Sequence, residues 1–189
     1  MMKNIELPKI FELVSRYYVF LFLNFYGFGK ILGGQFYRKG NLPPEIAEIP
    51  LGEVGAYDLA WTFMGYSFWY IFFVGVSQII GSWLLLWDRT KLLGVVILFP
   101  IMLNIIVFDV LFLDTKDALV NATIYFFMLI YILYHNRVAV FNALDLFSKT
   151  VKNKIHFKEP MKIFLVIITM AVVFGIDQFF VTLVRNWYH

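Results

Sequence analysis

Five long apolar runs, separated by short polar segments, divide the chain. A helix crosses the roughly 30 Å hydrocarbon core of a bilayer with about 20 residues, and tilt accommodates longer runs. The runs lack the strict alternation of transmembrane strands, so the pattern predicts helices. The predicted spans are about 17–36, 61–87, 92–113, 118–134 and 163–184.

The polar segments predict the connections. Residues 88–91 and 114–117 read as tight turns. Segment 37–57 holds three prolines and three glutamates, and we expect an external loop with a short amphipathic piece on the membrane surface. Segment 135–162 carries six lysines and arginines, which is typical of a cytoplasmic basic loop; its first half is a candidate interfacial helix.

Composition supports a lipid environment. The chain is 61% hydrophobic and only 15% charged, against about 25% charged residues in an average soluble domain. With the N-terminus inside, eleven of the 16 lysines and arginines fall on the cytoplasmic side. We therefore expect an all-α integral protein of the bacterial inner membrane, one transmembrane domain over residues 1–189, with a cytoplasmic N-terminus and a periplasmic C-terminus. The opening segment mixes acids and bases, so no cleavable signal peptide is expected, and nothing suggests nucleic-acid binding.

Charged residues inside the apolar runs need partners, because a central Lys or Asp costs about 2.5–3.5 kcal/mol on insertion. Lys30 follows Arg16 by only 14 positions, too few for one helix to place both charges in water. In the predicted topology Lys30, Asp109 and Asp177 all fall in the outer half of their runs. We expect Lys30 to pair with Asp109, with Tyr66 and Asp177 nearby. Three interpretations stay open: a structural ion pair, a lysine snorkelling to the interface, or an outward-opening ligand pocket.

Two amides also lie within the runs. Gln78 lies in the inner half of the second run, and Asn104 lies near the middle of the third, four residues after Pro100. The proline removes a backbone donor and predicts a kink. We expect both amides to make interhelical hydrogen bonds, with a ligand contact as the alternative. Glycines in the first two runs predict close helix packing.

Several chemistries have no support. The absence of cysteine excludes thiolate metal sites and iron–sulfur clusters, and the three histidines lie outside the runs, so neither haem nor any metal site is expected. No intrinsic cofactor is expected. The 38 aromatic residues, 22 Phe, 11 Tyr and 5 Trp, make a flat hydrophobic ligand such as quinone conceivable, with Lys30 or Tyr66 donating to a carbonyl.

A set of motifs resembles the DoxX-like family of small bacterial membrane proteins. They are GFGKILGGQF around Lys30, the glycine-rich GYSFWYIFFVGVSQIIGS, and a tight Asp-Arg-Thr turn followed by Leu-Leu-Gly. The resemblance covers roughly residues 17–134 and implies a four-helix transmembrane bundle, to which the fifth run looks like an addition. Lys30 and Arg89 match family positions. Gln78 stands where the family often has a glutamate, which puts a proton or redox role there in doubt.

Some members of that family are similar to a subunit of a thiosulfate:quinone oxidoreductase. The leading hypothesis is thus a subunit or accessory of a larger membrane assembly, linked to quinone redox chemistry, with other membrane subunits as partners. As an enzyme it would be at most a quinone-contacting or non-catalytic subunit. The alternatives are a purely structural docking protein and a small-molecule carrier.

Overall fold

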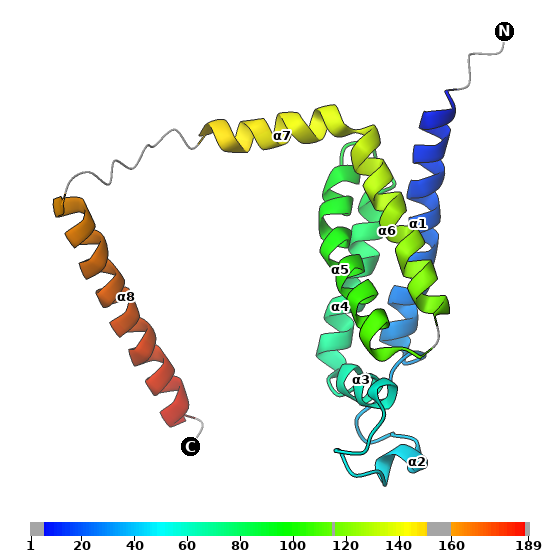
Figure 1. Cartoon of the computed structure of the whole chain (residues 1–189), viewed down its shortest axis with the longest axis horizontal. Coiled ribbons are helices and arrows are strands. Elements are labelled where there is room, and N and C mark those ends of the chain that lie inside the picture. Colours follow the sequence, from blue (N-terminus) through cyan, green and yellow to red (C-terminus); the bar gives the residue numbers. More distant parts are fainter. Residues whose placement is uncertain (1–5, 115, 151–159, 188–189) are drawn as a thin grey trace. The chain divides into compact units, whose positions relative to one another are not determined.

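The computed structural model describes residues 6–114, 116–150 and 160–187, and its regular structure in these ranges is helical. The all-α class is therefore confirmed. The helices, labelled in Figure 1, are α1 Leu7–Leu32, α2 Pro44–Ala47, α3 Ala56–Gly65, α4 Phe68–Leu84, α5 Lys91–Phe112, α6 Asp117–His135, α7 Arg137–Thr150 and α8 Pro160–Trp187.

The chain forms two units, Met1–Ala143 and Leu144–His189. In the first unit, α1, α4, α5 and α6 pack as a bundle in which α1 contacts α4 and α6, and α5 contacts α4 and α6. Successive helices run in opposite directions, so neighbours are antiparallel (Figure 1). The hydrophobic core of the bundle consists of Val19, Leu23, Leu85, Val95, Leu98, Met102, Ala122, Tyr125, Leu129 and Ile132.

Glycines let three of these helices approach closely. A Cβ atom added to Gly27 of α1 would lie 3.0 Å from the carbonyl oxygen of Gly75 in α4. One added to Gly94 of α5 would lie 2.7 Å from the carbonyl oxygen of Gly81. The predicted packing role is confirmed at these contacts, because a side chain would force the backbones apart. Gly33 has another role and ends α1 with φ 95°.

The second apolar run does not form one straight helix. It breaks at Tyr66 and Ser67, and α3 meets α4 at an angle of 89°. Ser67 begins α4 as its N-cap, accepting a hydrogen bond from the backbone nitrogen of Tyr70 at 3.4 Å. The predicted single helix over 61–87 is wrong in this respect. The hydrophobic pattern includes Ser67 in the apolar run and does not show that this serine caps a new helix.

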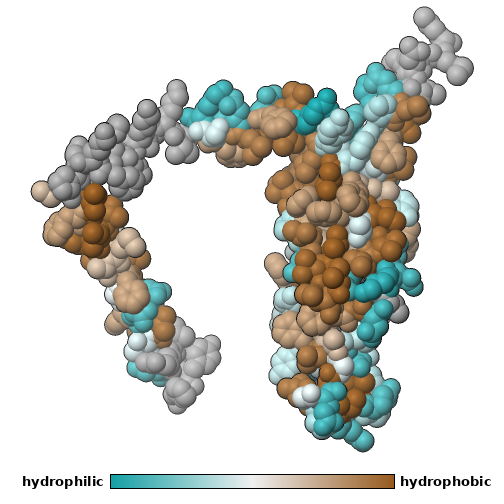
Figure 2. All heavy atoms as spheres, in the orientation of Figure 1, coloured by the Kyte–Doolittle hydropathy of each residue, from teal (hydrophilic) through white to brown (hydrophobic). Residues whose placement is uncertain are grey.

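Within the described residues, three helical segments are long and apolar enough to cross a membrane: Lys91–Phe112, Asp117–His135 and Ile163–Leu183. The bent pair α3–α4 is a fourth if it counts as one span. α1 has 26 residues but is not among the helices that are apolar enough to cross a membrane. It carries the charged residues Glu12, Arg16 and Lys30. Hydrophobic residues cover much of the bundle surface in Figure 2, as expected of a protein in contact with lipid.

The second unit contains α8, whose described side chains are exposed and largely apolar. The first half of the predicted basic loop is helical, as α7, with exposed Val138, Phe141 and Phe147. Its location at a membrane interface stays a prediction. Residues 151–159 of that loop lie outside the described residues.

Candidate functional site

Two cavities of about 270 and 220 Å³ lie in the first unit and have five lining residues in common. We call them the Asn104 cavity and the Gln78 cavity, after an amide that lines only one of them. The shared residues are Lys30, Gln35, Trp61, Ile105 and Asp109. Residues of α1, α3, α5 and the loop after α1 therefore border both hollows.

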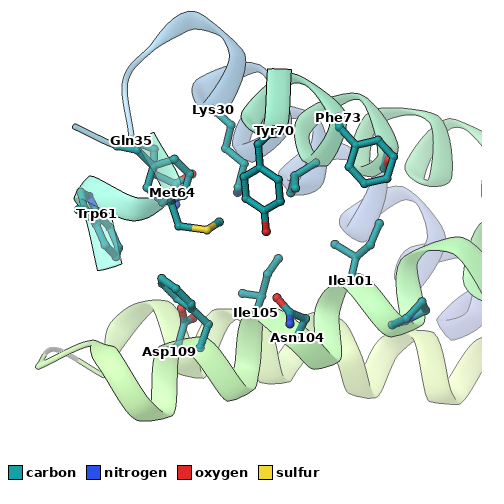
Figure 3. A pocket seen from close by; sticks show the side chains of 15 residues that line it. Lys30, Gln35, Trp61, Met64, Tyr70, Phe73, Ile101, Asn104, Ile105 and Asp109 are labelled. Carbon is teal, nitrogen blue, oxygen red and sulfur yellow. The ribbon is translucent and has the colours of Figure 1, made fainter. Parts of the chain in front are cut away.

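Lys30 is buried near the end of α1. Its exposed fraction is 5%, and Figure 3 shows its side chain directed into the Asn104 cavity. Among the described residues it has no side-chain hydrogen bond or ion pair; its Nζ lies 5.7 Å from the ring centroid of Tyr26, a cation–π distance. The backbone is fixed separately, since Arg38 donates a 2.6 Å hydrogen bond to the Lys30 carbonyl oxygen. The bundle thus encloses the Lys30 side chain, which favours a structural or ligand-binding role over snorkelling.

Asp109 of α5 lies across the cavity from Lys30 (Figure 3) and is 6% exposed. The predicted direct ion pair is not formed: the Lys30 nitrogen and the Asp109 carboxylate oxygens are more than 4.0 Å apart in the part of the chain that the structure describes. Both charges line the same two cavities, and their common depth in a membrane stays a prediction. The sequence could not show that a cavity separates the walls that carry them.

The two amides face different cavities and do not bond to each other. Gln78 is 1% exposed, and its Oε1 has no hydrogen-bond partner among the described residues. Asn104 lines the other cavity (Figure 3). The polar contact between α1 and α4 lies elsewhere: Asn24 donates to Ser82 Oγ at 2.9 Å and accepts from Trp83 Nε1 at 3.0 Å.

Tyr66 does not line this site, and Asp177 belongs to the other unit. Tyr66 is 60% exposed, lines neither cavity, and accepts a 3.3 Å hydrogen bond from Lys39. It sits at the break between α3 and α4, whereas Tyr70, one turn into α4, lines the Asn104 cavity instead (Figure 3). Asp177 belongs to α8 in the second unit, so its proximity to Lys30 stays a prediction.

The loop after α1 forms part of the wall through Gln35 and buried Phe36. The loop lies directly against α3 at Gly65. A Cβ atom added to this glycine would lie only 1.5 Å from the Tyr37 carbonyl oxygen. The Tyr37 hydroxyl donates a 3.0 Å hydrogen bond to Asp58. Loss of hydration and this bond raise the pKa of Tyr37 to about 12.

Five aromatic rings contribute to the rest of the wall. Trp61 lies 5.3 Å from the ring of Phe36 and 6.3 Å from that of Phe108, and Tyr70 and Phe73 also line the Asn104 cavity. An apolar wall with a few convergent polar groups is typical of small-molecule sites. Residues 6–114, 116–150 and 160–187 contain no cluster of three His, Cys, Asp or Glu side chains suited to a metal ion.

A second polar cluster, at the opposite end of α1, was missed from the sequence. Arg16 is 4% exposed; its Nε donates to the Leu85 carbonyl oxygen at 2.6 Å and its Nη1 to Asp88 at 2.8 Å. Buried Glu12 pairs with Lys91 at 3.0 Å. The hydrogen bond from Arg16 holds the pKa of Asp88 below its usual range. The available signal was the Glu-x-x-x-Arg spacing, which places both side chains on one helical face.

Comparisons with known proteins give limited guidance. No family model matches the chain, and no solved structure matches it. The chain is similar to the uncharacterized protein YwoB of Bacillus subtilis (strain 168), with 40% identity over 109 residues. The matched region is 57% of this chain and 63% of that relative, so the chain spans less than two thirds of the relative's length. Because YwoB is itself uncharacterized, the geometry of the cavities is the main guide to function.

Proposed function

We propose that the protein is an accessory subunit of a bacterial inner-membrane assembly and binds a flat apolar molecule of the quinone type in the Asn104 cavity. The observation that carries this proposal is buried Lys30, which faces an aromatic-walled cavity without a direct hydrogen-bond or ion-pair partner among the described residues. A ligand carbonyl would accept a hydrogen bond from its ammonium group. Trp61 and Tyr70 would flank the ring.

The energetic argument rests on the cost of an unpaired charge. A buried ammonium group that lacks a partner is strongly unfavourable, and an ionisable residue within a membrane helix therefore suggests a functional site. An apolar side chain would fill the same position without that cost. The two cavities together fall within the roughly 300–1,000 Å³ range of small-molecule sites.

The proposed topology follows the DoxX-like resemblance. In it, α1, the α3–α4 pair, α5 and α6 are four spans, α8 is a fifth, the N-terminus is cytoplasmic and the C-terminus periplasmic. The bias of lysines and arginines along the sequence supports this orientation. The sequence has no cysteine, so a thiolate-ligated redox centre would belong to a partner subunit.

The test is the quinone content of the purified protein. The full chain is extracted in mild detergent with any partners retained, and bound quinone is measured by mass spectrometry of the organic extract. The variant is Lys30→Met. The matched control is Lys39→Met, because Lys39 contacts Tyr66 outside the cavities.

We expect the wild type and Lys39→Met to retain quinone, and Lys30→Met to retain at least tenfold less, which corresponds to about 1.4 kcal/mol. Equal retention by both variants would show that Lys30 does not hold the ligand. A stoichiometric partner without quinone in the wild type would instead favour a structural docking protein.

A further inference from the structure

The two charged groups of the site are separated rather than paired. Lys30 and Asp109 lie on opposite walls of the Asn104 cavity (Figure 3), each nine-tenths or more buried. Neither side chain makes a hydrogen bond or ion pair within residues 6–114 and 116–150, the described part of their unit. The gap between them therefore has a donor on one side and an acceptor on the other.

The hydrogen-bonding capacity of these groups restricts what can fill the gap. An ammonium group only donates, and an ionised carboxylate only accepts. A ligand carbonyl or ether oxygen accepts from Lys30 but leaves Asp109 without a donor. A hydroxyl group accepts from Lys30 and donates to Asp109 at the same time, so it satisfies both buried charges.

The adjoining cavity also favours a ligand that donates hydrogen bonds. The Oε1 atom of Gln78 is buried in the Gln78 cavity and also lacks a donor among the described residues. The Asp109 carboxylate of α5 and the Gln78 amide oxygen of α4 thus both line the hollows without a donor among the described residues. A ligand that brings O–H groups can donate to these oxygens, whereas a ligand that brings only carbonyl oxygens cannot.

We propose that the site recognises a hydroxylated aromatic ring, a phenol or a hydroquinone, through its O–H group, and binds it more tightly than the corresponding quinone or O-methyl ether. This inference rests on the proposed function, because it takes the same cavity as the ligand site and adds the form of ligand preferred. Lys30 donates to the hydroxyl oxygen, and Asp109 accepts the hydroxyl proton. The aromatic wall around Trp61 covers the ring.

A matched pair of probes isolates the O–H group. The full chain in nanodiscs is equilibrated with 4-nonylphenol or with its methyl ether, 4-nonylanisole, and binding is measured by equilibrium dialysis against empty nanodiscs. We expect a dissociation constant at least tenfold lower for the phenol, since a hydrogen bond to a charged group is stronger than a neutral one. Asp109→Leu should reduce the preference to less than about twofold. The control Asp114→Leu, at an exposed position outside both cavities, should keep it.

The outcomes separate this inference from the proposed function. Equal affinities in the wild type, or tighter binding of the ether, would overturn the hydroxyl preference while leaving a ligand site for flat rings. Binding of neither probe above empty nanodiscs would overturn the hydroxyl preference, and the quinone content of the purified protein would still decide the proposed function by itself. A preference that persists in Asp109→Leu would overturn the role given to Asp109. The wild-type comparison needs no variant, so it decides the matter even if Asp109→Leu fails to fold.

Discussion

The sharpest stability prediction concerns Arg16, which links α1 to the end of α4. Its guanidinium donates to the carbonyl oxygens of Leu85 and Leu86 at 2.6 and 2.7 Å. These carbonyls follow the last turn of α4, where helical partners are missing, so Arg16 acts as a C-terminal cap supplied by another helix. Replacing Arg16 with Met removes this cap and leaves a side chain of similar length.

The expected loss can be worked out group by group. Two buried carbonyls that lose their donors cost about 1–3 kcal/mol each. Asp88 adds little, because its side chain is 82% exposed. Glu12 keeps its 3.0 Å ion pair with Lys91, so its charge is not left alone. We therefore expect Arg16→Met to lower the free energy of unfolding by about 2–6 kcal/mol, the sum over the two carbonyl oxygens.

Unfolding in mixed micelles of maltoside detergent and SDS, followed by circular dichroism, measures this loss. Lys9→Met is the matched control, because Lys9 pairs with Glu6 on the surface with 70% and 60% of their side chains exposed. Its expected effect is below about 1 kcal/mol. Arg16→Lys should recover only part of the loss, since an ammonium group lacks the planar fork. Equal effects of Arg16→Met and Lys9→Met would refute the capping role.

Three further predictions use the same unfolding assay. Gly65→Ala should destabilise by about 1–3 kcal/mol, because the added Cβ would lie 1.5 Å from a backbone oxygen, whereas Gly29→Ala, with nothing within 4 Å, should change stability by less than about 1 kcal/mol. The folded state lowers the pKa of Asp88 below its ordinary 3.8. The contribution of the Asp88 carboxylate to the free energy of unfolding should therefore be complete above about pH 4 and should be lost as the pH falls further. Asp88→Asn should remove that pH dependence. Lys30→Met combined with Asp109→Leu should cost at least about 0.5 kcal/mol less than the sum of the single changes; additivity would show that the two charges do not interact.

The lengths of the apolar runs predicted α5 and α6 closely. The third and fourth runs, 92–113 and 118–134, correspond to α5 at Lys91–Phe112 and α6 at Asp117–His135. The first run was predicted to begin at residue 17, but α1 begins at Leu7. Its first turns carry buried Glu12 and Arg16, and charged residues end an apolar run even where they are paired inside a protein.

The candidate site was predictable in part. Depth in the membrane can be read from position along a run, and this placed Lys30 and Asp109 around one cavity. Distance across a bundle depends on the rotation and packing of helices, which one sequence does not reveal. The same limit explains why Gln78 and Asn104, expected to form interhelical bonds, line separate cavities.

The two polar clusters of the bundle provide an internal comparison. At the Arg16 cluster, the guanidinium meets two carbonyl oxygens and two carboxylates, and Glu12 also pairs with Lys91, so burial of these charges is compensated. At the cavities, Lys30 and Asp109 are equally buried but stand apart. A bundle that can compensate buried charges at one end has no need, for stability alone, to leave them separated at the other. The pair without direct contact is therefore the stronger candidate for binding a molecule from outside the chain.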